Sequence, residues 1–574
     1  MDEKKKKLVV VVILACVFLV VFIGTRLTQD GPKTKHEASE EKADKKLEKL
    51  LRDIECTNVD PVKGNIADVT YSLADELPDI QTNQPVVVGD GEINLEIFSS
   101  SEKSGKVGQL GWLSEIAQEF NNSGMKINGK TCSITVRTVD SGLASDYIAS
   151  GKYLPDCFTP SNELFGEMTI ANGGTLTLEK QRLVGNVAGI LFKSKKKEEI
   201  EQNHGALSMK AITEATINNE IAMGYTNPQY SATGLNFLLS ALNCFDPGKV
   251  LSNKAEEQFV AFQKNIPFIA STTTQMDSAV VSGALDGMII EYQTYVSTPN
   301  YKNNYEFTPF GARHDNPLYS VGKLSKNKKK LLKEFLKVLE SEESQKRATE
   351  VGFNGLDSYV SEDPVFDGDT IARAQQIWKD KKNAGGSVTA VFVTDISGSM
   401  DQEVVDANGD YTGKSALDVL KSALVNATKY ISDQNSIGLI SYSSKVFINL
   451  PIEKFDINQK SMFIGSVQNL QANGNTASYD AVAVALDMLN EKIEADPTTK
   501  PMLFLLTDGQ TNTGCKLSEV KPLVEAYGIP VYCISYNEEV SALAELSSVN
   551  EAEYISSDSD DIIYKIKKLF NSQM

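Results

Sequence analysis

The sequence predicts an α/β protein in which a two-lobed domain is followed by a domain with a doubly wound, Rossmann-like parallel sheet, behind an N-terminal transmembrane helix. Strand-like and helix-like stretches alternate from residue 91 to the C-terminus, which is typical of parallel sheets. A glycine-containing link at residues 383–387 divides this alternation in two. An uncharged apolar run at residues 8–24 supplies the helix.

Length and composition limit the classes of protein that need consideration. With 574 residues, the chain is long enough for three or four domains of roughly 150 residues each. Its 76 acidic residues against 57 Lys and Arg give a net charge of −19, which argues against nucleic-acid binding because that needs a basic face. The three histidines, His36, His204 and His314, are scattered, so we expect neither a histidine-rich zinc site nor a triad.

The N-terminus has the pattern of a membrane anchor. Four lysines precede the apolar run of residues 8–24, which spans roughly 26 Å as a helix at about 1.5 Å per residue. We expect a single-pass plasma-membrane protein with residues 1–7 as a cytoplasmic tail and the domains extracellular. Lipoprotein anchoring at Cys16, within a loose match to a lipobox, is an alternative, and a cleaved secretory signal is another.

The rest of the chain divides into three segments. Residues 25–90 are expected to form a charged stalk and linker, since residues 36–55 are dense in charge and only a few leucines and one isoleucine follow helical spacing. Residues 91–385 contain the first set of alternating elements and are predicted to be the two-lobed domain. Residues 387–574 contain the second set and are predicted to be the doubly wound domain.

Oxygen-bearing side chains follow the strands of the second domain. One predicted strand ends directly in a D-x-S-x-S motif made by Asp395, Ser397 and Ser399, and another ends in Asp508. Thr476 lies in a loop before an apolar helix. Because loops at the carboxyl ends of parallel strands converge, these five residues are expected to meet in one crevice. Such oxygen ligands suit a hard divalent cation: we expect Mg²⁺, with Ca²⁺ and Mn²⁺ as alternatives.

This constellation resembles the von Willebrand factor A domain and its metal-ion-dependent adhesion site, over residues 387–574. The resemblance implies that Asp395, Ser397, Ser399 and Thr476 contact the metal directly or through water, with Asp508 nearby. It also implies that a carboxylate from a protein partner completes the coordination shell. The alternative is a domain that has lost its metal, in which the same residues form turns and helix caps.

Residues 91–385 resemble the periplasmic-type solute-binding proteins, especially the oxyanion-binding branch. The resemblance rests on serine-containing turns and implies a small-molecule ligand between the lobes. The candidate ligand residues are Ser99, Ser100, Ser141, Ser161, Ser231, Thr233, Glu291 and Tyr292. Helix capping and turn formation would select the same serines. Glu291 would repel an oxyanion unless protonated or turned away, which leaves a neutral ligand, a cationic ligand or a degenerate pocket open.

The sequence favours binding over catalysis. It contains no nucleophile with a base, no paired acids and no cofactor loop that stands out, so we predict that the protein is not an enzyme. The predicted function is that of a membrane-tethered bacterial surface binding protein, in which the adhesion site holds a protein partner and the two-lobed domain takes a small ligand. The alternative is an accessory substrate-binding receptor of a transport system, with the A domain as a scaffold.

Overall fold

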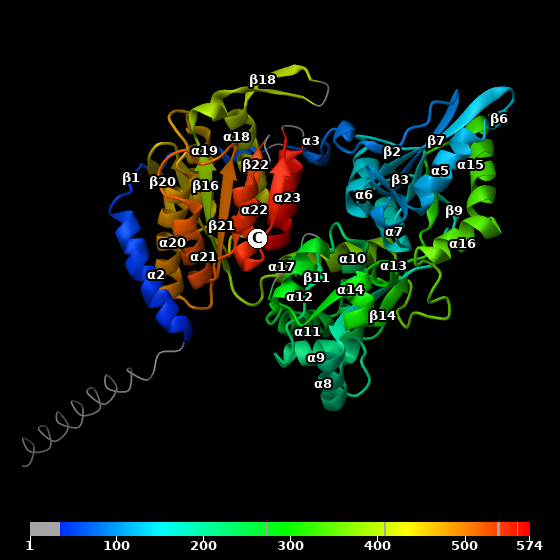
Figure 1. Ribbon diagram of the computed structural model, residues 1–574, viewed down its shortest axis with the longest axis horizontal. Coiled ribbons are helices and arrows are strands. Elements are labelled where there is room, and N and C mark those ends of the chain that lie inside the picture. The colour runs from blue at the N-terminus through cyan, green and yellow to red at the C-terminus, as the bar shows by residue number, and fades with distance from the viewer. Residues whose placement is uncertain are drawn as a thin grey trace, which may run out of the picture.

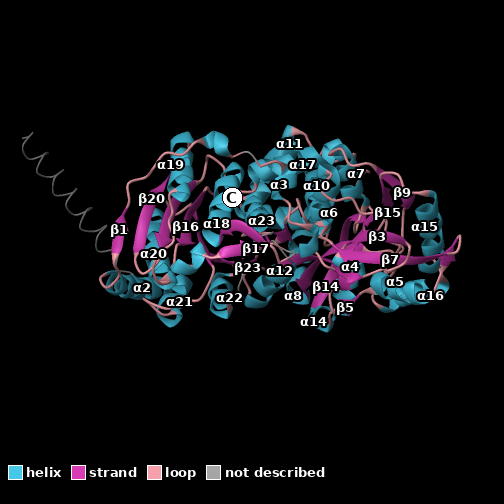
Figure 2. Ribbon diagram, turned by 90° about the horizontal axis from the view of Figure 1, so that it is seen from above, coloured by secondary structure: helices cyan, strands magenta, loops and turns pink. Residues whose placement is uncertain are grey.

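The chain folds into two α/β bodies that lie side by side, with the C-terminus close to where they meet (Figure 1). In a view from above, helices surround the strands of each body (Figure 2). The computed structural model describes residues 35–69, 71–267, 269–270, 273–406, 409–536, 540–558 and 561–574. Both bodies therefore have the α/β class that the alternating sequence pattern predicts.

The predicted membrane anchor lies outside the described residues, as does Cys16. Within the residues that the structure describes, no helix combines the length and the apolar character needed to cross a bilayer.

One body is built on a seven-stranded sheet with the strand order β1-β20-β19-β16-β21-β22-β23. Strands β16, β19, β21, β22 and β23 are parallel to one another, and β20 runs antiparallel to β19. The strands are β1 (Cys56–Asn58), β16 (Val388–Asp395), β19 (Ser436–Tyr442), β20 (Val446–Lys454), β21 (Lys500–Thr507), β22 (Val531–Tyr536) and β23 (Tyr554–Ser557).

Helices cover both faces of this sheet. Side chains of the central strand β16 alternate between the faces: Phe392 packs into one core, and Val391 and Val393 pack into the other. The first face is covered by α18 (Ala416–Ala427), α19 (Ile457–Gln468) and α23 (Ile562–Gln573). The second is covered by α20 (Ser478–Ala495), α21 (Leu517–Tyr527) and α22 (Ser541–Ser547). A hairpin of β17 (Glu403–Val405) and β18 (Tyr411–Ser415) projects from this body.

The segment expected to be a solvated stalk differs from that expectation in its described part. Helix α2 (Lys35–Leu51) buries Ala43 and Leu47 in the core beneath α20 and α21, and its Asp44 Oδ1 accepts a hydrogen bond from Tyr527 OH at 2.8 Å. Strand β1 then pairs in parallel with β20 at the edge of the sheet. The physical reason is that the few apolar residues of α2 share one face, so packing them removes apolar surface from water.

The other body has two lobes. The sheet of the first lobe has the order β2-β7-β3-β8-β15-β9, with β6 beside β7. Its strands are β2 (Pro85–Val87), β3 (Ile93–Ser99), β6 (Lys126–Ile127), β7 (Lys130–Thr138), β8 (Cys157–Thr159), β9 (Leu176–Lys180) and β15 (Leu318–Val321). Its helices are α4 (Ser101–Ser104), α5 (Trp112–Asn122), α6 (Ser141–Ser150), α7 (Glu163–Ala171), α15 (Lys326–Leu339) and α16 (Glu342–Glu350), and a small hairpin joins β4 (Gly105–Lys106) to β5 (Gln109–Leu110).

The second lobe contains a three-stranded sheet with the order β13-β10-β14 and the short pair β11-β12. The strands are β10 (Val187–Lys193), β11 (Tyr225–Thr226), β12 (Ile269–Ala270), β13 (Gly287–Glu291) and β14 (Tyr305–Arg313). The helices are α8 (Ser194–His204), α9 (Met209–Ile217), α10 (Ala232–Phe245), α11 (Asn253–Gln263), α12 (Thr273–Ser282), α13 (Tyr292–Ser297), α14 (Pro299–Asn304) and α17 (Gly368–Lys381).

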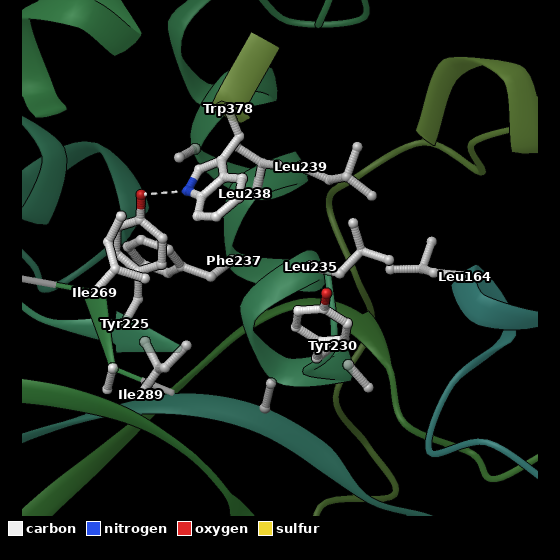
Figure 3. Packing of buried hydrophobic residues seen from close by; sticks show 14 of the residues in the cluster. Leu164, Tyr225, Tyr230, Leu235, Phe237, Leu238, Leu239, Ile269, Ile289 and Trp378 are labelled. Atoms are coloured by element: carbon white, nitrogen blue, oxygen red, sulfur yellow. Dashed lines mark hydrogen bonds between the residues drawn. The ribbon is translucent and has the colours of Figure 1, made fainter. Parts of the chain in front are cut away.

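The largest core lies in this two-lobed body. Trp378 of α17 is fully buried, and its indole Nε1 donates to Tyr225 OH at 3.0 Å (Figure 3). Helix α10 contributes most of one face, including Phe237, to the same core. A hydrogen-bonded indole inside an apolar cluster fixes the position of α17. This matters because the link from α17 leads directly to β16.

The C-terminal helix α23 lies between the two bodies. Its Gln573 Nε2 donates to the Ile269 carbonyl at 3.0 Å, and Ser572 Oγ accepts from Asn227 Nδ2 at 2.7 Å. Lys382, buried after α17, donates from Nζ to carbonyls in the last turn of α23. Burial lowers the pKa of Lys382 to about 7, and Lys379 adds to this effect. The last helix of one domain is thus bonded to the core of the other.

A buried acidic side chain joins three parts of the chain at the same junction. Glu76, at the end of α3 (Leu73–Glu76), belongs to the segment that precedes the two-lobed body. Its carboxylate is contacted by Asn426 Nδ2 at 3.0 Å, Tyr430 OH at 2.5 Å, Lys567 Nζ at 3.1 Å and Lys429 Nζ. Lys567 also lies 3.9 Å from Asp146 of the first lobe. The cluster holds the preceding segment, the sheet domain and the first lobe together.

Candidate functional site

The proposed metal centre begins at the end of the central strand. Every residue of β16 is buried, which places Asp395 at the carboxyl edge of the sheet with no exposed surface. Its carboxylate accepts from the Ser397 backbone N–H at 2.7 Å, from Thr507 Oγ1 at 2.6 Å and from Tyr442 OH at 3.3 Å. Burial raises the pKa of Asp395 despite these hydrogen bonds. An ionised Asp395 is therefore costly unless a positive charge lies next to it.

A chain of oxygen atoms links Asp395 to the neighbouring strand. The hydroxyls of Ser397 and Ser399 lie 3.0 Å apart, and Ser399 Oγ donates to Asp508 Oδ1 at 2.9 Å. Asp508 directly follows β21, the strand beside β16. The structure thus brings four of the five predicted residues into one hydrogen-bonded group, as adjacent parallel strands require.

The loop that carries Thr476 is hydrogen-bonded to the same group. The Gly398 N–H donates to the Gly474 carbonyl at 2.9 Å. Gly474 has a φ of +85°, a backbone conformation that glycine adopts without a steric penalty. Thr476 is buried, and its backbone N–H donates to Asn512 Oδ1 at 2.9 Å. Thr476 is therefore held in the loop next to the D-x-S-x-S turn.

The chemistry of this donor set fits a hard cation. Two carboxylates and three hydroxyls are the oxygen ligands that Mg²⁺ and Ca²⁺ take. In the part of the chain that the structure describes, no cationic side chain pairs with Asp395, and no three His, Cys, Asp or Glu side chains gather as metal ligands. A cation here would depend on the hydroxyls as well as on the carboxylates. Cation binding stays a prediction.

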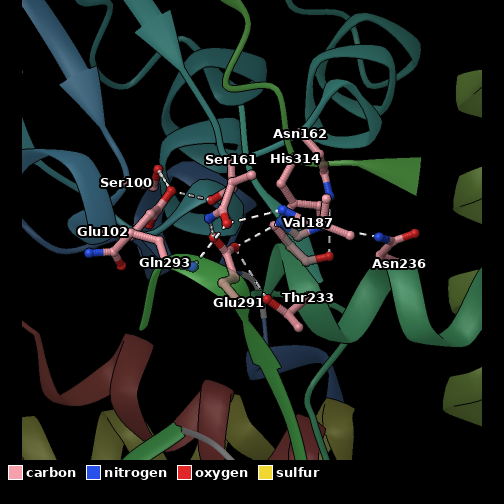
Figure 4. Close-up of polar contacts among 12 residues, drawn as sticks. Ser100, Glu102, Ser161, Asn162, Val187, Thr233, Asn236, Glu291, Gln293 and His314 are labelled. Carbon is pink, nitrogen blue, oxygen red and sulfur yellow. Dashed lines mark hydrogen bonds and ion pairs between the residues drawn. The ribbon is translucent and has the colours of Figure 1, made fainter. Parts of the chain in front are cut away.

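A second polar group lies between the two lobes (Figure 4). Glu291 ends β13 and is buried; its Oε1 lies 2.8 Å from His314 Nδ1 and 3.4 Å from Thr233 Oγ1. Asn186 Nδ2 donates to the other oxygen of Glu291. His314 follows β14, and Asn186 precedes β10, so this group sits where the chain crosses between the lobes. The polar contacts of Glu291 are thus with the protein itself.

The hydrogen bonds of His314 indicate its tautomer. Its Nε2 lies 3.0 Å from Asn162 Nδ2 and 3.1 Å from Asn236 Nδ2, and an amide nitrogen can only donate. Nε2 is therefore the acceptor and Nδ1 carries the proton that points at Glu291. A neutral imidazole fits a ring with no exposed surface.

The first lobe contributes a group that contains two of the predicted serines. Ser161 Oγ donates to Glu102 Oε1 at 2.6 Å, and Ser100 Oγ donates to the same oxygen. Lys103 is fully buried, and its Nζ lies 3.6 Å from Glu102 Oε1 and donates to Ser100 Oγ. Four of the predicted ligand residues, Ser100, Ser161, Thr233 and Glu291, thus lie in these two polar groups. Their role in ligand binding stays a prediction.

Of the other four predicted ligand residues, Ser99, Ser231 and Tyr292 have local partners. Ser99 is buried at the end of β3 and donates to the neighbouring Ser100 carbonyl at 3.2 Å. Ser231 caps α10 by accepting from the Gly234 N–H at 3.1 Å, and Ser141 is the first, buried residue of α6. The Tyr292 ring packs edge-on against Phe307 with the ring centroids 5.3 Å apart. Ser231 therefore caps a helix, an alternative that the sequence left open, and Tyr292 packs against a neighbouring aromatic ring.

Sequence reasoning predicted Glu291 but missed Glu102 and Lys103, the charged residues beside Ser100 and Ser161. Glu102 and Lys103 directly follow the Ser99-Ser100-Ser101 turn, so a polar turn ending in adjacent opposite charges was the available signal. His314, Asn162 and Asn186 stand in unrelated stretches of the sequence, and only the crossing of strands between the lobes brings them together.

A doubly wound sheet with hydroxyl and carboxylate groups at its carboxyl edge, joined to a two-lobed α/β domain, defines a protein built from two binding modules. Residues 390–571 match the von Willebrand factor type A domain, and residues 110–354 match the bacterial extracellular solute-binding protein family. These matches confirm the two resemblances seen in the sequence, each over part of the chain. Both are modules of binding or adhesion, and the second indicates a secreted or surface location.

Several solved structures match parts of the chain at low sequence identity. They include the von Willebrand factor type A protein from Catenulispora acidiphila (16% identity, TM-score 0.28, covering 32% of this chain and 42% of that chain). They also include the sulfate-binding protein SubI from Mycobacterium tuberculosis H37Rv (14% identity, TM-score 0.33, covering 46% of this chain and 87% of that chain). A third is BatB from Bacteroides thetaiotaomicron (17% identity, TM-score 0.27, covering 33% of this chain and 98% of that chain). The chain spans less than half of the Catenulispora protein. No curated protein matches the chain.

Proposed function

We propose that this chain is a membrane-tethered bacterial surface protein whose A domain holds a protein partner through a divalent cation, Mg²⁺ first and Ca²⁺ or Mn²⁺ as alternatives. The observation that carries the proposal is the hydrogen-bonded group of Asp395, Ser397, Ser399 and Asp508 at the carboxyl edge of the sheet. Thr476, in the loop bonded to this group, is the fifth ligand residue. The apolar run of residues 8–24 is the proposed tether.

A bound cation would supply a positive charge and an open coordination position for a carboxylate of the partner. Asp395 provides the buried negative charge that attracts the cation, and Thr507 and Tyr442 keep its carboxylate oriented. Ser397 and Ser399 offer neutral oxygen atoms, so they add no negative charge to that of Asp395 and Asp508 around the cation.

The junction between the domains supports a binding role for the whole chain. The contacts of α23 and of Glu76 fix the A domain on the two-lobed domain, so both modules face their partners in a set orientation. The two-lobed domain is the proposed module for a small ligand. A role as a transport receptor would need the site between the lobes to take a free solute at micromolar concentrations or below.

The test is thermal unfolding of the full chain in EDTA and in Mg²⁺, Ca²⁺ or Mn²⁺. A cation that binds only the folded state increases the free energy of unfolding by mass action, by about 2.7 kcal/mol at a hundred times its Kd, and so raises the transition temperature. Asp395→Ala and Asp508→Ala should remove this rise. Asp433→Ala, an exposed aspartate on the same domain, is the matched control and should retain it.

Partner capture then tests the adhesion step. An acidic peptide or protein ligand found by metal-dependent pull-down should be released by EDTA and by Asp395→Ala. A folded wild-type chain with the same unfolding temperature in EDTA and in all three cations would refute the metal proposal.

A further inference from the structure

We infer that Ser100, Ser161 and Lys103 form an anion-binding site between the lobes and that the chain's own Glu102 carboxylate occupies it. The inference rests on the proposed function only in treating the two-lobed domain as a solute-binding module. It narrows the ligand class, because a free oxyanion such as sulfate or phosphate can enter only where the Glu102 carboxylate is absent or displaced.

The hydrogen-bond pattern around Glu102 is that of a bound anion. Two hydroxyl donors from separate turns, Ser100 and Ser161, converge on the single oxygen Oε1. The ammonium group of Lys103 lies 3.6 Å from the same oxygen as an ion pair, and it donates its hydrogen bonds to Ser100 Oγ and to the Pro160 carbonyl at 3.5 Å. Ser100 precedes α4 and Ser161 lies between β8 and α7, so the two hydroxyls face each other across the carboxylate. Figure 4 shows both serines directed at Glu102.

Burial of the positive charge supports this assignment. The Lys103 side chain has no exposed surface, and a lone buried ammonium group would be strongly unfavourable. The carboxylates of Glu102 and Glu291 both favour its charged form, while burial lowers its pKa. Burial alone would raise the pKa of Glu102, but Lys103 and the two serine hydroxyls outweigh it and hold this pKa below its ordinary value.

The position of Glu102 explains how a site of this kind could be vacated. The Glu102 side chain is 13% exposed and the Lys103 side chain is fully buried, so Glu102 lies nearer to solvent than the ammonium group does. Glu291 is engaged by His314 and Asn186 and does not replace Glu102 as a partner of the serines. Removing the Glu102 carboxylate leaves two hydroxyl donors and one ammonium group, the donor set that a sulfate or phosphate accepts from.

The test is calorimetric titration of the full chain with sodium sulfate and with inorganic phosphate. Any binding of either anion by wild type should be weak, and Glu102→Ala should bind at least one of them at least about tenfold more tightly than wild type does, equivalent to 1.4 kcal/mol. Adding Ser161→Ala to Glu102→Ala should remove the gain. Glu115→Ala, an exposed glutamate on α5, is the matched control and should behave as wild type.

Several results would overturn the inference. Sulfate or phosphate binding by wild type that is lost in Ser161→Ala would show that Glu102 does not fill the site, and this result needs no Glu102 variant to fold. A folded Glu102→Ala protein, checked by circular dichroism, that binds neither anion would do the same. The Mg²⁺ response measured in these variants separates the two proposals, since it reports only on the A domain.

Discussion

Glu76→Gln should destabilise the junction between the domains strongly. Glu76 is buried against Lys567 at 3.1 Å and against Lys429. Among the described residues, replacing its charge leaves Lys567 with one acidic partner, Asp146, 3.9 Å away. Burial lowers the pKa of Lys567, so the structure already disfavours its positive charge. Removing one partner of a buried ion pair costs about 3–5 kcal/mol. Because glutamine keeps the size and can still accept from Tyr430, the lower end of that range is the expected loss.

Urea unfolding followed by far-ultraviolet circular dichroism measures this loss. Two domains need not unfold together, so the midpoint of the first transition is the quantity to compare. Glu55→Gln removes a carboxylate from an exposed pair with Lys445 and should cost about 1 kcal/mol or less. A Glu76→Gln midpoint indistinguishable from that of Glu55→Gln would refute the argument that this cluster holds the domains together.

Two further predictions concern the contacts of the junction and of α2. Lys382→Met should remove a pH dependence of the free energy of unfolding. Because burial lowers the Lys382 pKa to about 7, the unfolded chain binds more protons than the folded chain between pH 7 and about 10.4. The Lys382 side chain therefore makes stability rise with pH, by at most about 1.4 kcal/mol per pH unit. Thermal unfolding from pH 6.5 to 9 measures the slope, and an equal slope in both proteins would contradict it. Leu47→Ala should cost about 2–4 kcal/mol locally and speed proteolysis of α2, whereas the exposed Lys49→Ala should not; equal cleavage rates would contradict the packing.

The clustering of Asp395, Ser397, Ser399 and Asp508 was predictable because their positions follow from topology. A run of buried residues that ends in Asp395, and a neighbouring run that ends in Asp508, must place both carboxylates at the same edge once the strands are parallel. The hydroxyls of Ser397 and Ser399 then follow from chain connectivity. The α/β class could be predicted for the same reason, since alternation leaves few arrangements.

The stalk and the charged residues between the lobes were harder to predict. The residues of α2 are mostly charged. Its sequence does not indicate that Ala43 and Leu47 pack under α20 and α21, because those helices lie more than four hundred residues further along the chain. Likewise the partnership of Ser161 with Glu102 joins residues 59 positions apart through two turns. Local pattern identifies such residues as polar but does not say with which side chain they pair.

The pairing of β1 with β20 makes the order of synthesis matter. Strand β1 is made before the whole two-lobed domain, while its partner strand is made about 390 residues later. The two-lobed domain is in this sense inserted into the sheet domain, with both of its ends attached to the same neighbour. During translation α2 and β1 have no docking surface until β20, α20 and α21 emerge. The sheet domain is therefore completed last, and a chain cut short before α21 would leave its first helix and strand without the surface that covers them.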